Sequence, residues 1–185
     1  MENADADAAA ILLSAGLADE AYSRYAIEAN QGTTFLATYR SIAKKYPMKA
    51  PAQILNDLVA STPGQEGKWF AAAKDAGLYD EAIALAKRTP CDPRTLARAA
   101  RDFAATNPEF AIEAGLTALH WIAAGYGYEI TGLDVLAAYS GAMEAAKNAA
   151  AVDQTRNRIR ELLAAGKSPS RDFMAQVLGR AFETP

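Results

Sequence analysis

The 185-residue sequence contains one cysteine and one histidine, and both scarcities restrict its functions. A single cysteine cannot form an internal disulfide, which fits a reducing compartment. One histidine and one distant cysteine give no metal-ligand spacing, and no nucleophile–base arrangement is visible. We therefore expect no bound metal, no cofactor and no enzymatic activity.

Valine, isoleucine and long apolar runs are also scarce. Few β-branched residues mean that strands are poorly supported, whereas 44 alanines favour helices. No uncharged apolar run approaches the length of a membrane span, and the acidic N-terminus lacks the features of a signal peptide. A net charge of −3 is unlike that of a protein that binds nucleic acid through its overall field. We expect a cytoplasmic protein without a membrane segment.

The chain does contain a repeat. Ala-Gly-Leu-Ala-Asp-Glu-Ala at 15–21 returns 61 positions later, at 76–82, as Ala-Gly-Leu-Tyr-Asp-Glu-Ala, and the gapless register gives 10 identities over 33 positions. A weaker third copy relates 73–80 to 146–153 with an offset of 73, so about 12 residues are inserted, most of them in 125–132. A fixed period of this kind is typical of stacked helical units.

Turn signals divide the chain into about eleven helices. We assign Thr33 as the N-cap of the third helix, and Asp92-Pro93 and Asn107-Pro108 as the starts of the seventh and eighth. Gly16 and Gly32 follow helix ends and are expected in the left-handed conformation. The expected ranges are approximately 4–13, 19–29, 34–45, 51–61, 66–75, 79–88, 93–105, 108–124, 133–148, 152–165 and 169–182.

The segment 77–86, Gly-Leu-Tyr-Asp-Glu-Ala-Ile-Ala-Leu-Ala, followed by Pro90, resembles the second helix of a tetratricopeptide repeat. Residues 16–21 are a weaker copy, while Trp69-Phe70 are shifted relative to the family's first helix and the period is not that of the family. The resemblance implies a right-handed α-solenoid and protein–protein scaffolding through a concave face. We expect one all-α domain over 1–185, an array of antiparallel helix hairpins with units at about 4–62, 66–130 and 133–185.

The helix expected over 93–105 carries Arg94, Arg98 and Arg101 on one stripe, opposite an apolar face. From 87 to 101 there are five positive charges and one negative charge, whereas residues 1–30 have a local charge of −5. Such a strip suits an acidic peptide or a nucleic-acid backbone, although a solvated helix face is the simpler interpretation. Because Arg40 and Arg101 share a repeat position, an inter-helix hydrogen bond would explain them at least as well.

The segment 125–132, Gly-Tyr-Gly-Tyr-Glu-Ile-Thr-Gly, breaks the helical pattern. Tyr126 and Tyr128 are candidate partner contacts, because tyrosine offers contact area and a hydroxyl at low entropy cost. The simpler interpretation is a connector that packs its tyrosines on the neighbouring hairpin.

Other chemically capable residues have structural interpretations. His120 falls on the apolar side of its expected helix, which favours a buried, hydrogen-bonded histidine. Cys91 is assigned as an ordinary loop residue, although nearby basic residues could lower its pKa. The acidic pairs 19–20 and 80–81 fall in first helical turns, where they complement the helix dipole. The large aromatic residues are expected in the core: Trp69, Phe70 and Trp121.

The first functional hypothesis is a non-enzymatic protein-interaction scaffold or adaptor of the helical-repeat type, with another protein or a peptide as its partner. The second is a nucleic-acid-binding helical-repeat adaptor that uses the basic strip of helix 93–105. A continuous basic groove would favour the second. The candidate partner-binding residues are Arg94, Arg98, Arg101, Tyr126 and Tyr128; no catalytic, cofactor-binding or metal-binding residue is assigned.

Overall fold

The computed structural model describes residues 4–182, and every regular element in that range is helical. Eleven α-helices and two 3₁₀-helices are present there, without a strand, which confirms the expected all-α fold. No helix of this range is long and apolar enough to cross a bilayer. The elements are α1 (Ala4–Ser14), α2 (Ala18–Tyr25), η1 (Glu28–Asn30), α3 (Phe35–Lys45), α4 (Pro51–Ser61), η2 (Glu66–Trp69), α5 (Phe70–Asp75), α6 (Tyr79–Arg88), α7 (Pro93–Phe103), α8 (Pro108–Ala123), α9 (Gly132–Asn148), α10 (Val152–Ala164) and α11 (Pro169–Phe182).

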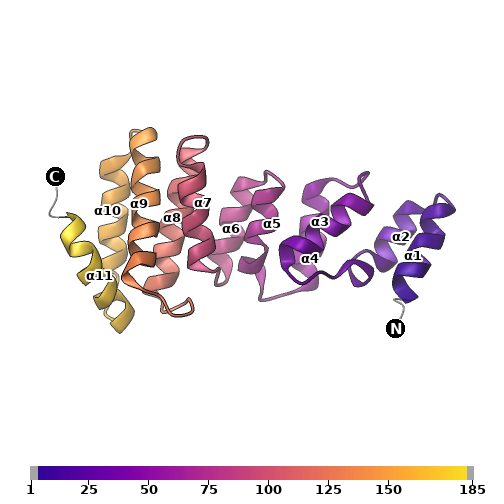
Figure 1. The fold of residues 1–185 in the computed structure, drawn as a ribbon, viewed down its shortest axis with the longest axis horizontal. Helices are drawn as coiled ribbons and strands as arrows, with labels where there is room; N and C mark the ends of the chain where they lie inside the picture. Colours follow the sequence, from indigo (N-terminus) through magenta and orange to yellow (C-terminus); the bar gives the residue numbers. More distant parts are fainter. Residues whose placement is uncertain (1–3, 183–185) are drawn as a thin grey trace.

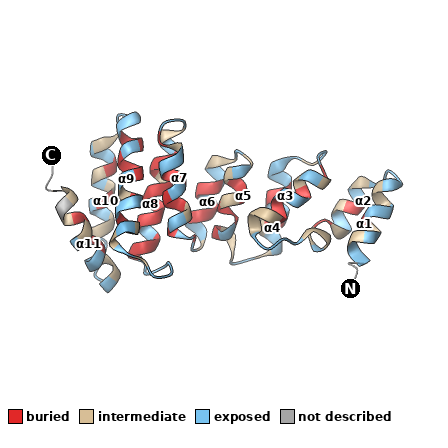
Figure 2. Ribbon diagram, viewed as in Figure 1, coloured by how far each residue is buried: buried red, intermediate tan, exposed pale blue. Residues whose placement is uncertain are grey.

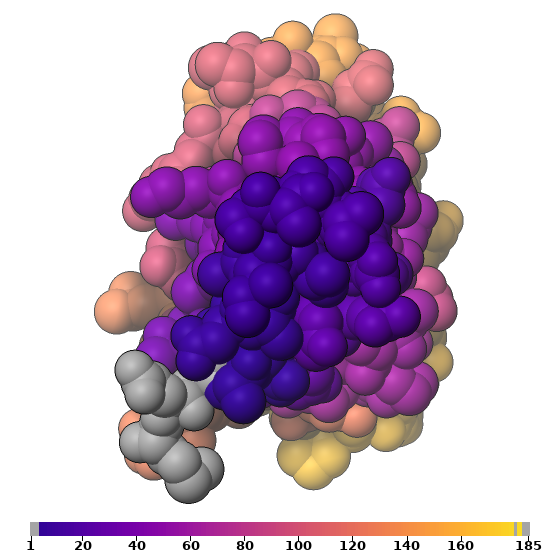
Figure 3. Space-filling model, turned by 90° about the vertical axis from the view of Figure 1, so that its right-hand side faces the viewer, coloured from indigo at the N-terminus to yellow at the C-terminus, as the bar shows by residue number. Residues whose placement is uncertain are grey.

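The helices follow one another along the long axis of the molecule, with α1 at one end and α11 at the other (Figure 1). Viewed from the N-terminal end, α1 and α2 stand in front of the rest of the chain (Figure 3). Contacts also join helices that are not consecutive: α3 packs on α5, α7 on α9, and α6 on α8. Each of these pairs therefore joins a helix to the α-helix two places further along the chain.

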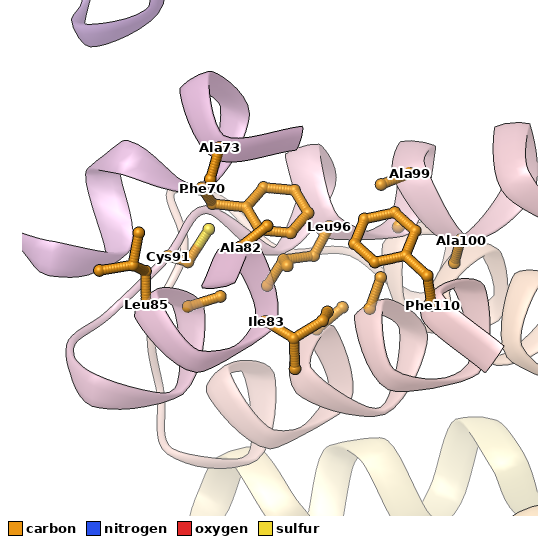
Figure 4. Close-up of a cluster of buried hydrophobic side chains, with 14 of the residues drawn as sticks. Phe70, Ala73, Ala82, Ile83, Leu85, Cys91, Leu96, Ala99, Ala100 and Phe110 are labelled. Carbon is orange, nitrogen blue, oxygen red and sulfur yellow. The ribbon is translucent and has the colours of Figure 1, made fainter. Parts of the chain in front are cut away.

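Burial is concentrated in the middle of the molecule, from α5 to α9 (Figure 2). α8 is buried along most of its length. Phe70 of α5 and Phe110 of α8 stack with ring centroids 6.1 Å apart (Figure 4). Phe103 of α7 meets Phe110 edge-on, with ring centroids 5.1 Å apart. These rings join α5, α7 and α8 into one core. The expected core aromatics are confirmed as buried: Trp69, Phe70 and Trp121.

One turn geometry ends four of the helices. After α1, the N–H of Gly16 bonds to the carbonyl of Leu13 and the N–H of Leu17 to that of Leu12, at 3.1 and 2.9 Å. This pair of bonds is the Schellman motif, which requires a left-handed residue after the helix. The same pair of bonds follows α5, α8 and α9, and the left-handed residues are Gly16, Gly77, Gly125 and Ala150.

Helix starts follow the expected side-chain caps, with one correction. Asp92 accepts hydrogen bonds from the first-turn amides of α7, and Asn107 accepts one from the N–H of Phe110. The cap of α3 is Thr34, whose hydroxyl accepts from the N–H of Ala37, so the assignment of Thr33 was wrong by one residue. Gly32 is not left-handed, and its N–H donates a hydrogen bond to the hydroxyl of Thr38.

The turn after α9 gives a stability prediction. Ala150 has φ 53°, a conformation that costs an alanine roughly 1–2 kcal/mol and a glycine almost nothing. Ala150→Gly should therefore raise the free energy of unfolding by about 1 kcal/mol in urea denaturation. Ala149→Gly is the matched control: Ala149 has φ −91°, so glycine there should give no gain. Equal changes for the two variants would show that the left-handed backbone is not the cause.

Candidate functional site

An open groove of about 730 Å³ runs between α7 and α9. Its volume falls in the range of ligand-binding clefts. The buried part of its lining consists of small residues, Ala97, Ala104 and Gly141, and long charged side chains surround them. The charged and polar lining residues are Asp92, Arg94, Arg98, Arg101, Asp134, Ser140 and Glu144.

The shape of the groove depends on a close approach of α7 and α9. A Cβ added at Gly141 would lie 2.9 Å from the Cβ of Ala100 and 3.1 Å from the amide nitrogen of Arg101. Since real Cβ atoms do not come that close, only glycine allows this crossing. Gly115 of α8 approaches α9 in the same way, because its Cβ would lie 2.7 Å from that of Ala142. Small residues on three helices thus fix the position of the groove walls.

Arg94 is held by groups of α9 and of the preceding loop. Its Nε donates to Asp134 at 2.8 Å, and one terminal nitrogen donates to the Glu129 carbonyl at 2.9 Å. The hydrogen bond from Arg94, aided by bonds from Thr131, outweighs burial and lowers the pKa of Asp134 to about 2. Arg94 therefore fastens the 125–131 loop to α7 and has little freedom to bind a ligand.

Arg98 and Arg101 have weaker partners. Within residues 4–182, Arg98 makes no ion pair, and its side chain bonds only to the Arg94 carbonyl and the Thr95 hydroxyl, at 3.4 and 3.3 Å. Arg101 bonds to Asp102, its chain neighbour, at 2.8 Å, and both side chains are mostly exposed. An exposed pair of this kind is worth little in free energy. These two arginines are the groove residues best able to meet a ligand.

The five positive charges between 87 and 101 do not form one continuous surface. Lys87 pairs with Glu113 at 2.6 Å and Arg88 with Glu66 at 3.3 Å, and neither basic residue lines the groove. Within the groove, three arginines are balanced by three carboxylates: Asp92, Asp134 and Glu144. The groove is therefore mixed in charge rather than continuously basic.

Tyr126 and Tyr128 lie outside this groove. Tyr126 packs edge-on against Trp121, with ring centroids 5.1 Å apart, and is 46% exposed; Tyr128 is 78% exposed. Tyr126 lines a smaller cavity of about 330 Å³ beside the start of α11. The structure thus separates the two groups of candidate residues, and the bond between Arg94 and the Glu129 carbonyl links them.

A second charged cluster, absent from the sequence-based predictions, joins α6, α8 and α10. Glu113 accepts hydrogen bonds from Lys87 and Arg158, which come from the two flanking helices. Burial alone would raise the pKa of Glu113, but the bonds from Arg158 and Lys87 outweigh it and lower the pKa to about 2. Sequence spacing could not reveal this cluster, because its members are 26 and 45 positions apart.

His120 corrects one expectation, whereas Cys91 lies in the loop between α6 and α7, as expected. His120 is exposed, with its ring edge-on to Trp121, because this part of α8 turns it toward solvent beside Thr117 and Leu162. Cys91 is buried in the core, and burial raises the pKa of its thiol to about 12, so neighbouring basic residues do not activate it (Figure 4). In the described range no group of three His, Cys, Asp or Glu residues is placed to hold a metal.

No protein-family model, characterised protein or solved structure matches this chain at a significant level.

The Glu113 cluster gives a pH-dependent prediction. The folded pKa of about 2 lies below the ordinary value of 4.5, so the stabilisation is complete above pH 4.5 and is lost as the pH falls toward 2. Glu113→Gln should lower the free energy of unfolding by about 1–3 kcal/mol at pH 7 and by much less at about pH 3, measured in urea. Glu144→Gln, at an exposed pair on α9, is the control and should change little at either pH. A loss for Glu113→Gln that does not vary with pH would contradict the assignment.

Proposed function

We propose that the chain is a non-enzymatic helical-repeat scaffold that binds an extended segment of another protein in the α7–α9 groove. In this proposal the fold is a tetratricopeptide-like, right-handed α-solenoid of antiparallel hairpins, with units at about 4–62, 66–130 and 133–185, and it works in the cytoplasm. The helix order along the long axis and the shared turn after α1, α5 and α9 support the repeat (Figure 1).

The observation that carries the proposal is the groove itself. Its buried lining of alanine and glycine leaves room for a peptide backbone and small side chains, and exposed arginines at its edge can make directional polar contacts. A helical-repeat fold provides an extended surface of this kind. The nucleic-acid alternative draws on the exposed guanidinium groups of Arg98 and Arg101, but a phosphate backbone would also meet the groove carboxylates.

Peptide selection tests the proposal directly, because a random library needs no identified partner. The library is displayed on phage and selected against the purified protein, and enriched peptides are measured by fluorescence anisotropy. Ala137→Trp places a large ring on the groove wall of α9 and should weaken binding at least ten-fold. Ala84→Trp is the matched control, because Ala84 is also exposed in a helix but lies away from the groove.

Two results would contradict the proposal. One is the absence of enriched peptides. The other is a set of peptides that bind both tryptophan variants as tightly as the unaltered chain, since those peptides would occupy another surface.

The two loop tyrosines should differ in their effects. Tyr128→Ala should change the free energy of unfolding by less than about 0.5 kcal/mol, because the side chain is mostly exposed. Tyr126→Ala should lower the free energy of unfolding by about 0.5–1.5 kcal/mol through the lost contact with Trp121.

If the loop belongs to the partner surface, the double variant Tyr126→Ala, Tyr128→Ala should also weaken peptide binding by about 1–2 kcal/mol. Unchanged binding would restrict the partner surface to the groove. Equal losses of stability for Tyr126→Ala and Tyr128→Ala would show that the contact between Tyr126 and Trp121 does not stabilise the fold.

A further inference from the structure

The internal repeat provides a comparison for the groove. Arg40 of α3 corresponds to Arg101 of α7, 61 positions later, and Asp75 of α5 corresponds to Asn148 of α9, 73 positions later. α3 packs on α5 as α7 packs on α9. Nε of Arg40 donates to Asp75 at 2.9 Å, and this bond is the main reason that the pKa of Asp75 is lowered. The first copy therefore joins its two helices by an arginine–carboxylate pair.

The second copy lacks this carboxylate. Asn148 takes the place of Asp75, and its amide donates to the carbonyl of Ala104 at 2.8 Å. Arg101 keeps the side chain that Arg40 uses but bonds only to its neighbour Asp102 within the described residues. Arg98, one turn earlier on α7, has no ion pair there. Within the described residues, two guanidinium groups beside the open groove thus form no ion pair with the facing helix, because its carboxylates pair elsewhere: Asp134 with Arg94 and Glu144 with Lys147.

We propose that the α7–α9 groove binds an acidic peptide, with an aspartate or glutamate side chain paired to Arg101 and Arg98 as Asp75 is paired to Arg40. This inference rests on the proposed function and specifies the chemistry of the partner. A guanidinium group binds a carboxylate through two parallel hydrogen bonds, which matches the planar geometry available at both arginines. The small residues of the lining accept the neutral residues between the carboxylates.

The balance of charge in the groove favours a peptide over a nucleic acid. Asp92, Asp134 and Glu144 line the same groove, and Arg94 is already occupied by Asp134. A run of phosphates at fixed spacing would bring negative charge against these carboxylates. A peptide can instead present one or two carboxylates at the Arg98–Arg101 end and neutral residues elsewhere.

The test uses defined probes on the full chain. The ¹⁵N-labelled protein is titrated with the decapeptide Glu-Ala-Glu-Ser-Ala-Gly-Ser-Ala-Gly-Ser, which carries two glutamates at one end, and with a neutral counterpart in which both glutamates are glutamines. The arginine Nε–H signals are followed by NMR. The glutamate peptide should shift the signals of Arg98 and Arg101 and bind at least ten-fold more tightly than the glutamine peptide. A ten-nucleotide oligothymidine is titrated in parallel, and tighter binding of this probe at the same two arginines would overturn the proposal in favour of nucleic acid.

Three substitutions, one of them a control, separate this mechanism from general attraction between charges. Asn148→Asp restores the carboxylate of the first copy and should compete with the peptide, lowering its affinity at least ten-fold. Arg101→Gln should lower it similarly and does not depend on the folding of the Asn148 variant. Arg40→Gln removes the same charge at the equivalent repeat position, where Asp75 already occupies the arginine, and should leave the affinity within two-fold.

The outcomes distinguish the two proposals. Equal affinity for the two decapeptides, or equal losses for Arg101→Gln and Arg40→Gln, would overturn the acidic specificity. If the phage selection nevertheless yields neutral peptides whose binding is blocked by Ala137→Trp, the scaffold function stands while the inferred preference for acidic peptides fails. If no peptide binds the groove, both fail.

Discussion

The close approach of α7, α8 and α9 is the constraint on which the rest of the structure depends. Gly141 against Ala100 and Gly115 against Ala142 allow backbone contacts that larger side chains would prevent. Alanine and glycine bury little apolar area each, so the stability of this region comes from many short contacts between helices and from the adjoining Phe70–Phe110 cluster. A larger side chain at Gly141 would separate the helices that form the groove.

The charged side chains of this region are paired on one face and partly unpaired on another. On the face of α6, α8 and α10, Lys87, Glu113 and Arg158 satisfy one another and join three helices. On the face of α7 and α9, Arg94 is similarly satisfied by Asp134, but Arg98 and Arg101 are not paired across the groove. Polar groups that are already paired hold a structure together, whereas exposed groups without such partners are available for binding. This contrast is why we place the binding surface on α7 and α9.

The sequence was most informative where one residue determines the local geometry. Asp92-Pro93 and Asn107-Pro108 marked the starts of α7 and α8, because caps and first-turn prolines act locally. The arginine stripe was also predictable from helical spacing. The balance of charge around these arginines was not predictable from spacing, because Asp134, which pairs with Arg94, lies 40 positions later in the sequence. The prediction that His120 is buried was wrong, because α8 is buried on nearly all sides. The spacing of its apolar residues therefore did not identify the side that remains exposed.

The position of a bound peptide is the most direct measure of whether the groove between α7 and α9 is the working surface. A nitroxide attached to a selected peptide broadens the amide signals of nearby residues of the ¹⁵N-labelled protein. We expect the strongest broadening in α7 and α9, around Ala97, Ala104 and Gly141, with little effect on α6 and α10. Broadening centred on Glu113 and Arg158, with the α7 and α9 signals unchanged, would contradict the assignment of this groove as the binding surface.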